Sequence, residues 1–130
     1  VPTWGSQQVA PFMMALAAEA LIRDWEQTQD PRLVLALTAA ADFFWARSWD
    51  PASRSMLYQL NPPNPGPAPD LNLLLAPVYA WLWARTGDVK YRDQADALFA
   101  GGVARAYFGG VKQYNQNFRW SFDYVKWRGL

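Results

Sequence analysis

Two short turns of similar sequence constrain the fold of this chain more than any other feature. Thr28-Gln29-Asp30 and Thr86-Gly87-Asp88 each separate two segments whose apolar residues recur at helical spacing. In each turn the Asp is placed to cap the helix that follows it, and in the second turn Gly87 is placed to end the helix before it. An Ala-Pro pair also stands near the start of the first helix of each unit, at Ala10-Pro11 and Ala76-Pro77. The sequence therefore predicts an internal repeat of helix, short turn, helix and long loop.

Apolar periodicity predicts two helical hairpins, one over about residues 6–47 and one over about residues 71–107. The individual helices are expected over residues 6–29, 31–47, 71–85 and 89–107. Apolar residues almost encircle the helix over 31–47, which is typical of a helix buried on more than one side. This pattern predicts an all-α fold, with the short turns at one end and the long connections at the other.

Two segments lie outside the predicted hairpins. Residues 48–70 form a long connection with five prolines between positions 62 and 69, a composition that excludes helix there. The C-terminal segment, residues 108–130, has aromatic residues that fit both strand alternation and helical spacing. We expect a helix over 119–128, preceded by a loop over 109–118 that is rich in Gly, Asn and Gln.

Length and composition limit the kind of protein this can be. A chain of 130 residues is expected to form a single domain, and its 52% apolar and 16% aromatic content excludes disorder. The absence of Cys and His removes disulfides, thiolate nucleophiles, Cys/His zinc sites and a histidine general base. Phosphate-loop and dinucleotide motifs are also absent. We therefore expect no metal and no cofactor, and any catalysis must use Asp, Glu, Tyr, Lys or Arg.

The charge pattern and the ends of the chain bear on partners and compartment. The formal net charge is +1, and although residues 105–128 mix cations with aromatics, they contain no nucleic-acid-binding motif. A nucleic-acid partner is therefore not expected. Apolar runs fall short of the roughly 20 residues that cross a bilayer, so no membrane partner is expected either. The chain starts at Val1 without a recognisable signal peptide, so we expect a segment of a longer protein and assign no compartment.

Two stretches of sequence resemble known carbohydrate-active proteins. T-G-D-V-K-Y-R-D-Q-A-D-A-L-F at 86–99 resembles the hairpin signature of α/α-toroid proteins, which include six-hairpin glycosidases, polysaccharide lyases and sugar epimerases. K-Q-Y-N-Q-N-F-R-W-S-F-D-Y at 112–124 is similar to bacterial carbohydrate-active helical modules. The resemblance implies an αα-hairpin repeat that makes up part of a toroid, about two and a half hairpins of it. It also implies a function associated with carbohydrates.

Candidate catalytic residues follow from what carbohydrate chemistry requires. Glycoside hydrolysis uses two carboxylates on either side of the scissile bond. Candidates at the predicted long-loop end are Asp50, Asp70 and Asp123. Asp50 also fits a turn before Pro51, and Asp70 also fits a helix cap. A polysaccharide lyase would instead use Tyr114 as its base, with cations and amides nearby to neutralise a uronate.

Sugar binding without catalysis requires exposed aromatic faces together with amide or charged groups. The candidate ligand-binding residues are Trp4, Trp49, Tyr58, Asn61, Lys112, Asn115, Asn117, Arg119 and Trp120. Four other tryptophans, at 25, 45, 81 and 83, are expected in the core. The sequence thus predicts a carbohydrate-associated module, part of a glycosidase- or lyase-like enzyme, that binds an oligosaccharide at the long-loop end. The alternative is a non-catalytic interaction domain whose aromatic surface packs on further hairpins or on a second copy.

Overall fold

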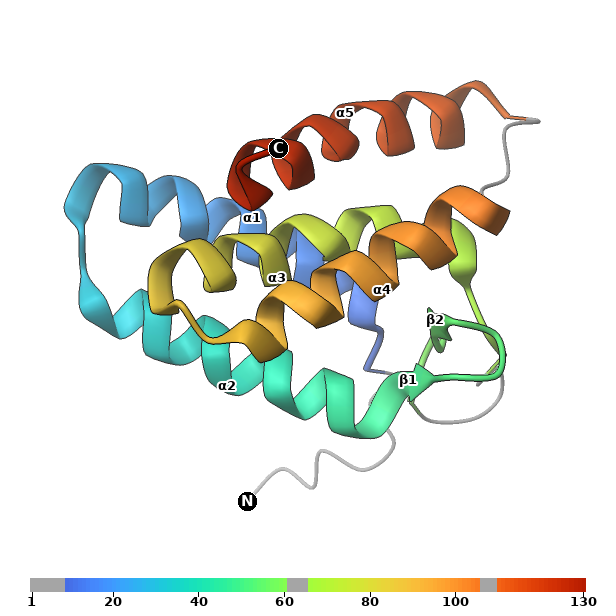
Figure 1. The fold of residues 1–130 in the computed structure, drawn as a ribbon, viewed down its shortest axis with the longest axis horizontal. Helices are drawn as coiled ribbons and strands as arrows, with labels where there is room; N and C mark the ends of the chain where they lie inside the picture. The colour runs from blue at the N-terminus through green and yellow to red at the C-terminus, as the bar shows by residue number, and fades with distance from the viewer. Residues whose placement is uncertain (1–8, 61–65, 106–109) are drawn as a thin grey trace, which may run out of the picture.

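The computed structural model describes residues 9–60, 66–105 and 110–130, which form an assembly of packed helices (Figure 1). The described residues form five α-helices: α1 (Pro11–Thr28), α2 (Pro31–Ser48), α3 (Asn72–Thr86), α4 (Val89–Arg105) and α5 (Val111–Arg128). A 3₁₀ turn, η1 (Pro69–Leu71), leads into α3. One antiparallel pair of two-residue strands, β1 (Trp49–Asp50) and β2 (Ser55–Met56), follows α2. The prediction of an all-α fold is confirmed.

Local sequence explains where the first two helices begin and end. Pro11 and Pro31 occupy first-turn positions of α1 and α2, where a missing N–H costs nothing. Residues 9 and 10 are not helical, so the predicted start at residue 6 is wrong and the helix begins at the proline. The carboxylate of Asp30 accepts a hydrogen bond from the backbone N–H of Arg32 at 2.9 Å, which caps α2 as predicted.

The α3–α4 turn is also as predicted. Gly87 follows α3 in the left-handed region at φ 70°, where glycine has no steric penalty. Asp88 then caps α4, since its carboxylate accepts from the backbone N–H of Lys90 at 3.0 Å. In Figure 1 both short turns lie at the left, whereas the β1–β2 hairpin, the end of α4 and the start of α5 lie at the right. The helices therefore alternate in direction, and we call the end of the assembly that holds the β1–β2 hairpin, the end of α4 and the start of α5 the loop end.

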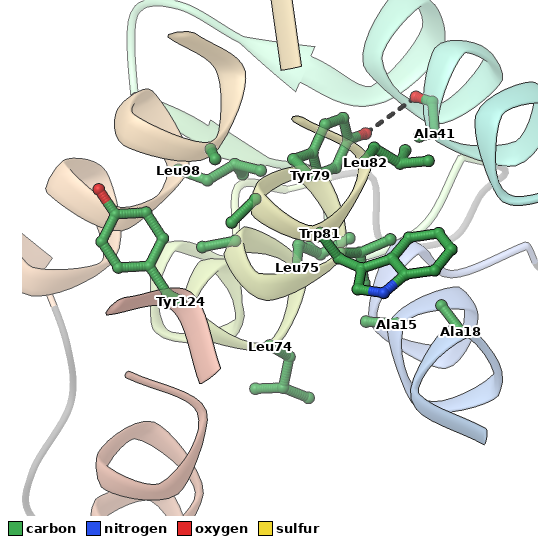
Figure 2. Close-up of a cluster of buried hydrophobic side chains, with 14 of the residues drawn as sticks. Ala15, Ala18, Ala41, Leu74, Leu75, Tyr79, Trp81, Leu82, Leu98 and Tyr124 are labelled. Carbon is green, nitrogen blue, oxygen red and sulfur yellow. Dashed lines mark hydrogen bonds between the residues drawn. The ribbon is translucent and has the colours of Figure 1, made fainter. Parts of the chain in front are cut away.

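The core is built around α3, which contacts each of the other four described helices. Every residue from Asn72 to Leu82 is buried. Figure 2 shows Trp81 on the side of α1, near Ala15 and Ala18, while Tyr79 donates its hydroxyl hydrogen to the Ala41 carbonyl of α2 at 2.9 Å.

The four tryptophans expected in the core do belong to it, to different degrees. Trp81 is fully buried, and Trp25 meets it edge-on at a ring-centroid distance of 5.4 Å. Trp45 and Trp83 are partly buried and pack against the same cluster. Aromatic side chains therefore supply much of the apolar area that α3 shares with its neighbours.

Two predictions about individual helices are wrong. Burial on several sides was expected for α2, but α2 leaves Leu35 70% exposed and Phe43 48% exposed, and the enclosed helix is α3. The predicted loop over 109–118 is wrong for residues 111–118, which belong to α5. In α5, Phe118 stacks with Tyr114 at 6.0 Å and meets Phe122 edge-on at 5.0 Å, and such ring contacts one turn apart favour helix over loop.

Asn72 fixes the loop end to the core. Its side-chain oxygen accepts from the backbone N–H of Met56, and its side-chain nitrogen donates to the carbonyls of Arg54 and Leu98. A side chain at Gly101 of α4 would overlap the Arg54 carbonyl, so the close approach of the hairpin to α4 requires glycine. The loop end is therefore held rigidly at the point where the chain enters α3.

Candidate functional site

The principal pocket of the loop end lies between α1, η1, α3 and α5, and we call it the loop-end pocket. Its volume is about 310 Å³. The described residues that line it are Phe12, Leu16, Tyr58, Asp70, Leu71, Leu74, Lys112 and Gln116. Three of the predicted site residues, Tyr58, Asp70 and Lys112, are thus brought together from three distant parts of the sequence.

Each side of the loop-end pocket has its own chemical character. Phe12 and Tyr58 form an aromatic pair, with ring centroids 5.3 Å apart and the planes tilted by 34°. Asp70 projects from η1, and Lys112 and Gln116 stand one turn apart near the start of α5. The pocket therefore combines an aromatic wall with a carboxylate, an ammonium group and an amide.

Backbone hydrogen bonds place Tyr58 at this pocket. The N–H of Tyr58 donates to the Gly66 carbonyl at 2.8 Å, and the neighbouring N–H of Leu57 donates to the Ser48 carbonyl at 2.9 Å. Leu60 N–H reaches the Val9 carbonyl at 2.9 Å, which ties the loop to the residues just before α1. The long connection between α2 and α3 is thus anchored on both sides of the tyrosine.

The first predicted carboxylate, Asp50, has a structural role in its own turn. It accepts hydrogen bonds from the backbone N–H groups of Ala52 and Ser53 and from the Ser53 hydroxyl. The Ser53 hydroxyl, followed by the Ala52 N–H, holds the pKa of Asp50 below its usual value. Its neighbour Trp49 stacks on Trp45 at 4.5 Å and is partly buried.

A second cavity, the tryptophan pocket, lies between α1, α3 and α5. Its volume is only about 20 Å³, roughly enough for one water. Glu19 and Asp123 both line it, but Glu19 already accepts hydrogen bonds from Arg119 and from the Trp120 indole N–H. Trp120 is buried, so its ring is not available for stacking on a sugar. This pair of acids therefore has no room for a sugar ring between its members.

A third cavity, the Asn117 pocket, lies between α3, α4 and α5 and has a volume of about 150 Å³. The described residues that line it are Leu73, Val103, Tyr114, Asn117, Phe118 and Ser121. Asn117 is only 2% exposed, and its side-chain nitrogen has no hydrogen-bond partner among the described residues. Tyr114 thus lies in a different pocket from Asp70, and Asn115 is exposed and lines none of the three.

Polar contacts hold the C-terminal half of α5 against α4. Asp96 accepts hydrogen bonds from the Tyr124 hydroxyl at 2.7 Å and from Arg128 at 2.6 and 3.0 Å. Burial, reinforced by the hydrogen bond to Asp96, raises the pKa of Tyr124 to about 12. Burial works against the charge of Asp96, but the bonds from Arg128 and Tyr124 outweigh it and lower the pKa of Asp96. This contact fixes the position of α5 and so of all three pockets.

The three predicted carboxylates do not form a catalytic pair. Asp70 lines the loop-end pocket, Asp123 lines the tryptophan pocket, and Asp50 is used within its own turn. Glu19 lines the tryptophan pocket but was not among the predicted site residues. Its contact with Arg119 joins residues 100 positions apart, which local spacing does not reveal. Trp4 and Asn61 lie outside the described residues.

The described part of the chain lacks two features, a cluster of metal-ligating side chains and a membrane-spanning helix. No three His, Cys, Asp or Glu side chains gather there as a metal ion would require. None of the described helices has both the length and the apolar character needed to cross a bilayer. Comparison with known families, curated proteins and solved structures finds no match to this chain.

Proposed function

We propose that this protein is a carbohydrate-binding helical module whose loop-end pocket holds one sugar ring. The observation that supports this most directly is the pairing of an aromatic wall, Phe12 and Tyr58, with polar groups on the same pocket. A sugar presents C–H groups on its ring face and hydroxyls around its edge, so it needs both kinds of surface. A volume of about 310 Å³ lies at the small end of ligand pockets, which suits a single ring.

Binding fits this pocket better than hydrolysis does. Glycoside hydrolysis needs two carboxylates around one bond, and Asp70 is the single acid among the described residues that line the loop-end pocket. The segments outside the description, 1–8, 61–65 and 106–109, contain no Asp or Glu. In a larger enzyme of α/α-toroid type this chain would supply a binding subsite, and the position of the pocket at the loop end supports that proposal.

Calorimetric titration with monosaccharides tests the proposal. We expect binding by the parent chain and at least a tenfold loss of affinity in Tyr58→Ala, because the aromatic wall is removed. Phe43→Ala is the matched control, since Phe43 is 48% exposed on α2 and Tyr58 is 40% exposed. The proposal fails if no sugar binds, or if both variants bind as the parent does.

The outer face of α5 supports a second candidate function, self-association. Tyr114, Phe118 and Phe122 are 50%, 56% and 61% exposed along this face, a continuous aromatic stripe. Three of the four cations on α5, namely Arg119, Lys126 and Arg128, are already paired with acids of the same chain, and the fourth is Lys112 of the loop-end pocket. Two such faces would therefore meet without strong repulsion, as a symmetric dimer requires.

Sedimentation velocity over a range of concentrations tests self-association. We expect the dimer of the parent chain to be lost in the double variant Phe118→Ser and Phe122→Ser. The matched control is Leu35→Ser, which changes an exposed apolar residue on α2. A parent chain that stays monomeric throughout contradicts this second function.

A further inference from the structure

The charges of the loop-end pocket differ from most others in the molecule. Elsewhere, carboxylates and cations pair within the chain, as Asp96 does with Arg128 and Glu19 with Arg119. Asp70 and Lys112 both line the loop-end pocket. Within the described part of the chain, neither has an ion-pair or side-chain hydrogen-bond partner. One pocket thus carries one negative and one positive group that do not neutralise each other.

Asp70 and Lys112 reach the loop-end pocket from different elements of the fold. Asp70 is set by the 3₁₀ turn η1, which is continuous with the buried start of α3. Lys112 belongs to the first turn of α5, which lines the same pocket. The hydrogen bonds of Asn72 fix the entry into α3, and with it the backbone that carries Asp70. In the structure the ammonium group of Lys112 forms no ion pair with this carboxylate.

We propose that the loop-end pocket takes a zwitterionic sugar, with an ammonium group against Asp70 and a carboxylate against Lys112. This inference rests on the proposed carbohydrate-binding function and names its ligand class. The ring face lies on Phe12 and Tyr58, and the Gln116 amide serves hydroxyl groups. The chemical class is an amino sugar that also carries a carboxylic acid.

Electrostatic complementarity selects this class over its simpler relatives. A neutral sugar would desolvate Asp70 and Lys112 without pairing either of them. A uronate would pair with Lys112 but leave Asp70 desolvated and unpaired, and a plain amino sugar would pair with Asp70 but leave Lys112 desolvated and unpaired. A zwitterion pairs both groups and adds two charge-assisted hydrogen bonds.

A matched series of four monosaccharides tests the inference by calorimetric titration. The series is glucose, glucosamine, glucuronate and 2-amino-2-deoxyglucuronate, which share one ring and differ in charge. At about pH 6 the amines are protonated and the carboxylates ionised. We expect 2-amino-2-deoxyglucuronate to bind best and glucose worst, with about a tenfold gain for each matched charge and smaller gains at high salt.

Two near-isosteric variants test the roles of the two charged side chains one at a time. Asp70→Asn should weaken the two ligands with an amine by about tenfold and leave glucuronate unweakened. Lys112→Gln should weaken the two ligands with a carboxylate by about tenfold and leave glucosamine unweakened. Asp24→Asn and Arg47→Gln, both at exposed positions on other helices, are the matched controls and should leave all four affinities unchanged. Thermal melting of each variant confirms that it is folded.

The outcomes distinguish failure of the inference from failure of the function. If glucose binds as well as the charged sugars and Tyr58→Ala abolishes that binding, the zwitterion preference is wrong and the carbohydrate function stands. If either charge variant weakens all four ligands equally, charge selection is also wrong. If none of the four sugars binds, the carbohydrate function is wrong and the zwitterion preference is wrong with it.

Discussion

Helices α3 and α5 are similar in length but differ in how the molecule uses them. Every residue of α3 from Asn72 to Leu82 is buried. In α5, Trp120 and Tyr124 face inward and are buried, while Phe118 and Phe122 are more than half exposed. Figure 1 shows α3 in the middle of the assembly and α5 along its edge.

This difference separates the part of the molecule that stabilises it from the part that can bind a ligand. Apolar burial holds α3, whereas α5 is fastened in part by polar contacts to Asp96, Glu19 and Glu26. The tryptophan, Asn117 and loop-end pockets all lie along α5, where an edge helix leaves gaps against its neighbours. The enclosed helix α3 forms the centre of the core, and the partly enclosed helix α5 lines all three pockets.

The largest expected effect comes from truncating the centre of α3. Trp81→Ala should lower the free energy of unfolding by about 3–5 kcal/mol, because it empties a fully buried indole site. Phe122→Ala on α5, at 61% exposed, should change it by about 0.5 kcal/mol or less. Urea denaturation measures both. Similar losses in the two variants would remove the distinction between the helices.

The second-largest loss of stability is expected from removing the buried hydrogen bonds of Asn72. Asn72→Ala at the start of α3 should cost about 2–3 kcal/mol, because the Met56 N–H and the Arg54 and Leu98 carbonyls lose their partner. Asn115→Ala, at an exposed position on α5, should be nearly neutral. Chemical denaturation of both variants checks this, and an unchanged stability for Asn72→Ala would show that the loop end is not held as described.

Acid should loosen α5 through Asp96. The pKa of this carboxyl is lower in the folded protein than in the unfolded chain, so its contribution to stability is present above the unfolded value near 4. The contribution is lost as pH falls through the lower folded pKa. Asp96→Asn should therefore reduce stability at neutral pH and weaken its dependence on pH below about 4. Thermal melts across that range test this, and a pH profile identical to the parent's would contradict it.

The smallest expected effect is at the contact between α1 and α5. Lys126→Gln removes the ion pair with Glu26 of α1, which has a distance of 3.3 Å and exposed partners, and it leaves the Glu26–Arg23 pair in place. Such surface pairs contribute about 0–1 kcal/mol, and salt screens them. Urea denaturation at low and high salt measures the change. A loss well above 1 kcal/mol would mean that α5 depends on this contact much more than its exposure indicates.

Features fixed by neighbouring residues could be predicted from the sequence. Asp30 caps the start of α2, and Gly87 ends α3 in a left-handed conformation. Both effects depend only on neighbouring residues, so the two short turns were predicted correctly. The choice between α2 and α3 as the enclosed helix was not local. Both helices are rich in apolar residues, and α3 is the enclosed one because α5 packs against it. The sequence predicted a loop over 109–118, so it did not indicate that a helix of this length would cover α3.

The candidate site likewise contains features that the sequence predicted and features that depend on contacts between distant residues. Tyr58, Asp70 and Lys112 were expected at the loop end and do line one pocket there. Gln116 joins them because residues 111–118 are helical, which the sequence did not predict, so that it stands one turn after Lys112. Trp120 was expected to bind sugar, but it is buried with its indole N–H on Glu19, a contact between residues about 100 positions apart.

Mapping a bound sugar by NMR tests the central claim most directly, namely that the edge helix α5 and the loop end form the binding site. In a ¹H–¹⁵N titration with 2-amino-2-deoxyglucuronate, we predict shifts of the amide signals of Tyr58, Asp70, Lys112 and Gln116, with α2 signals such as Leu35 unchanged. Shifts centred on α2 or on the Asn117 pocket, or no shifts at all, would contradict the account.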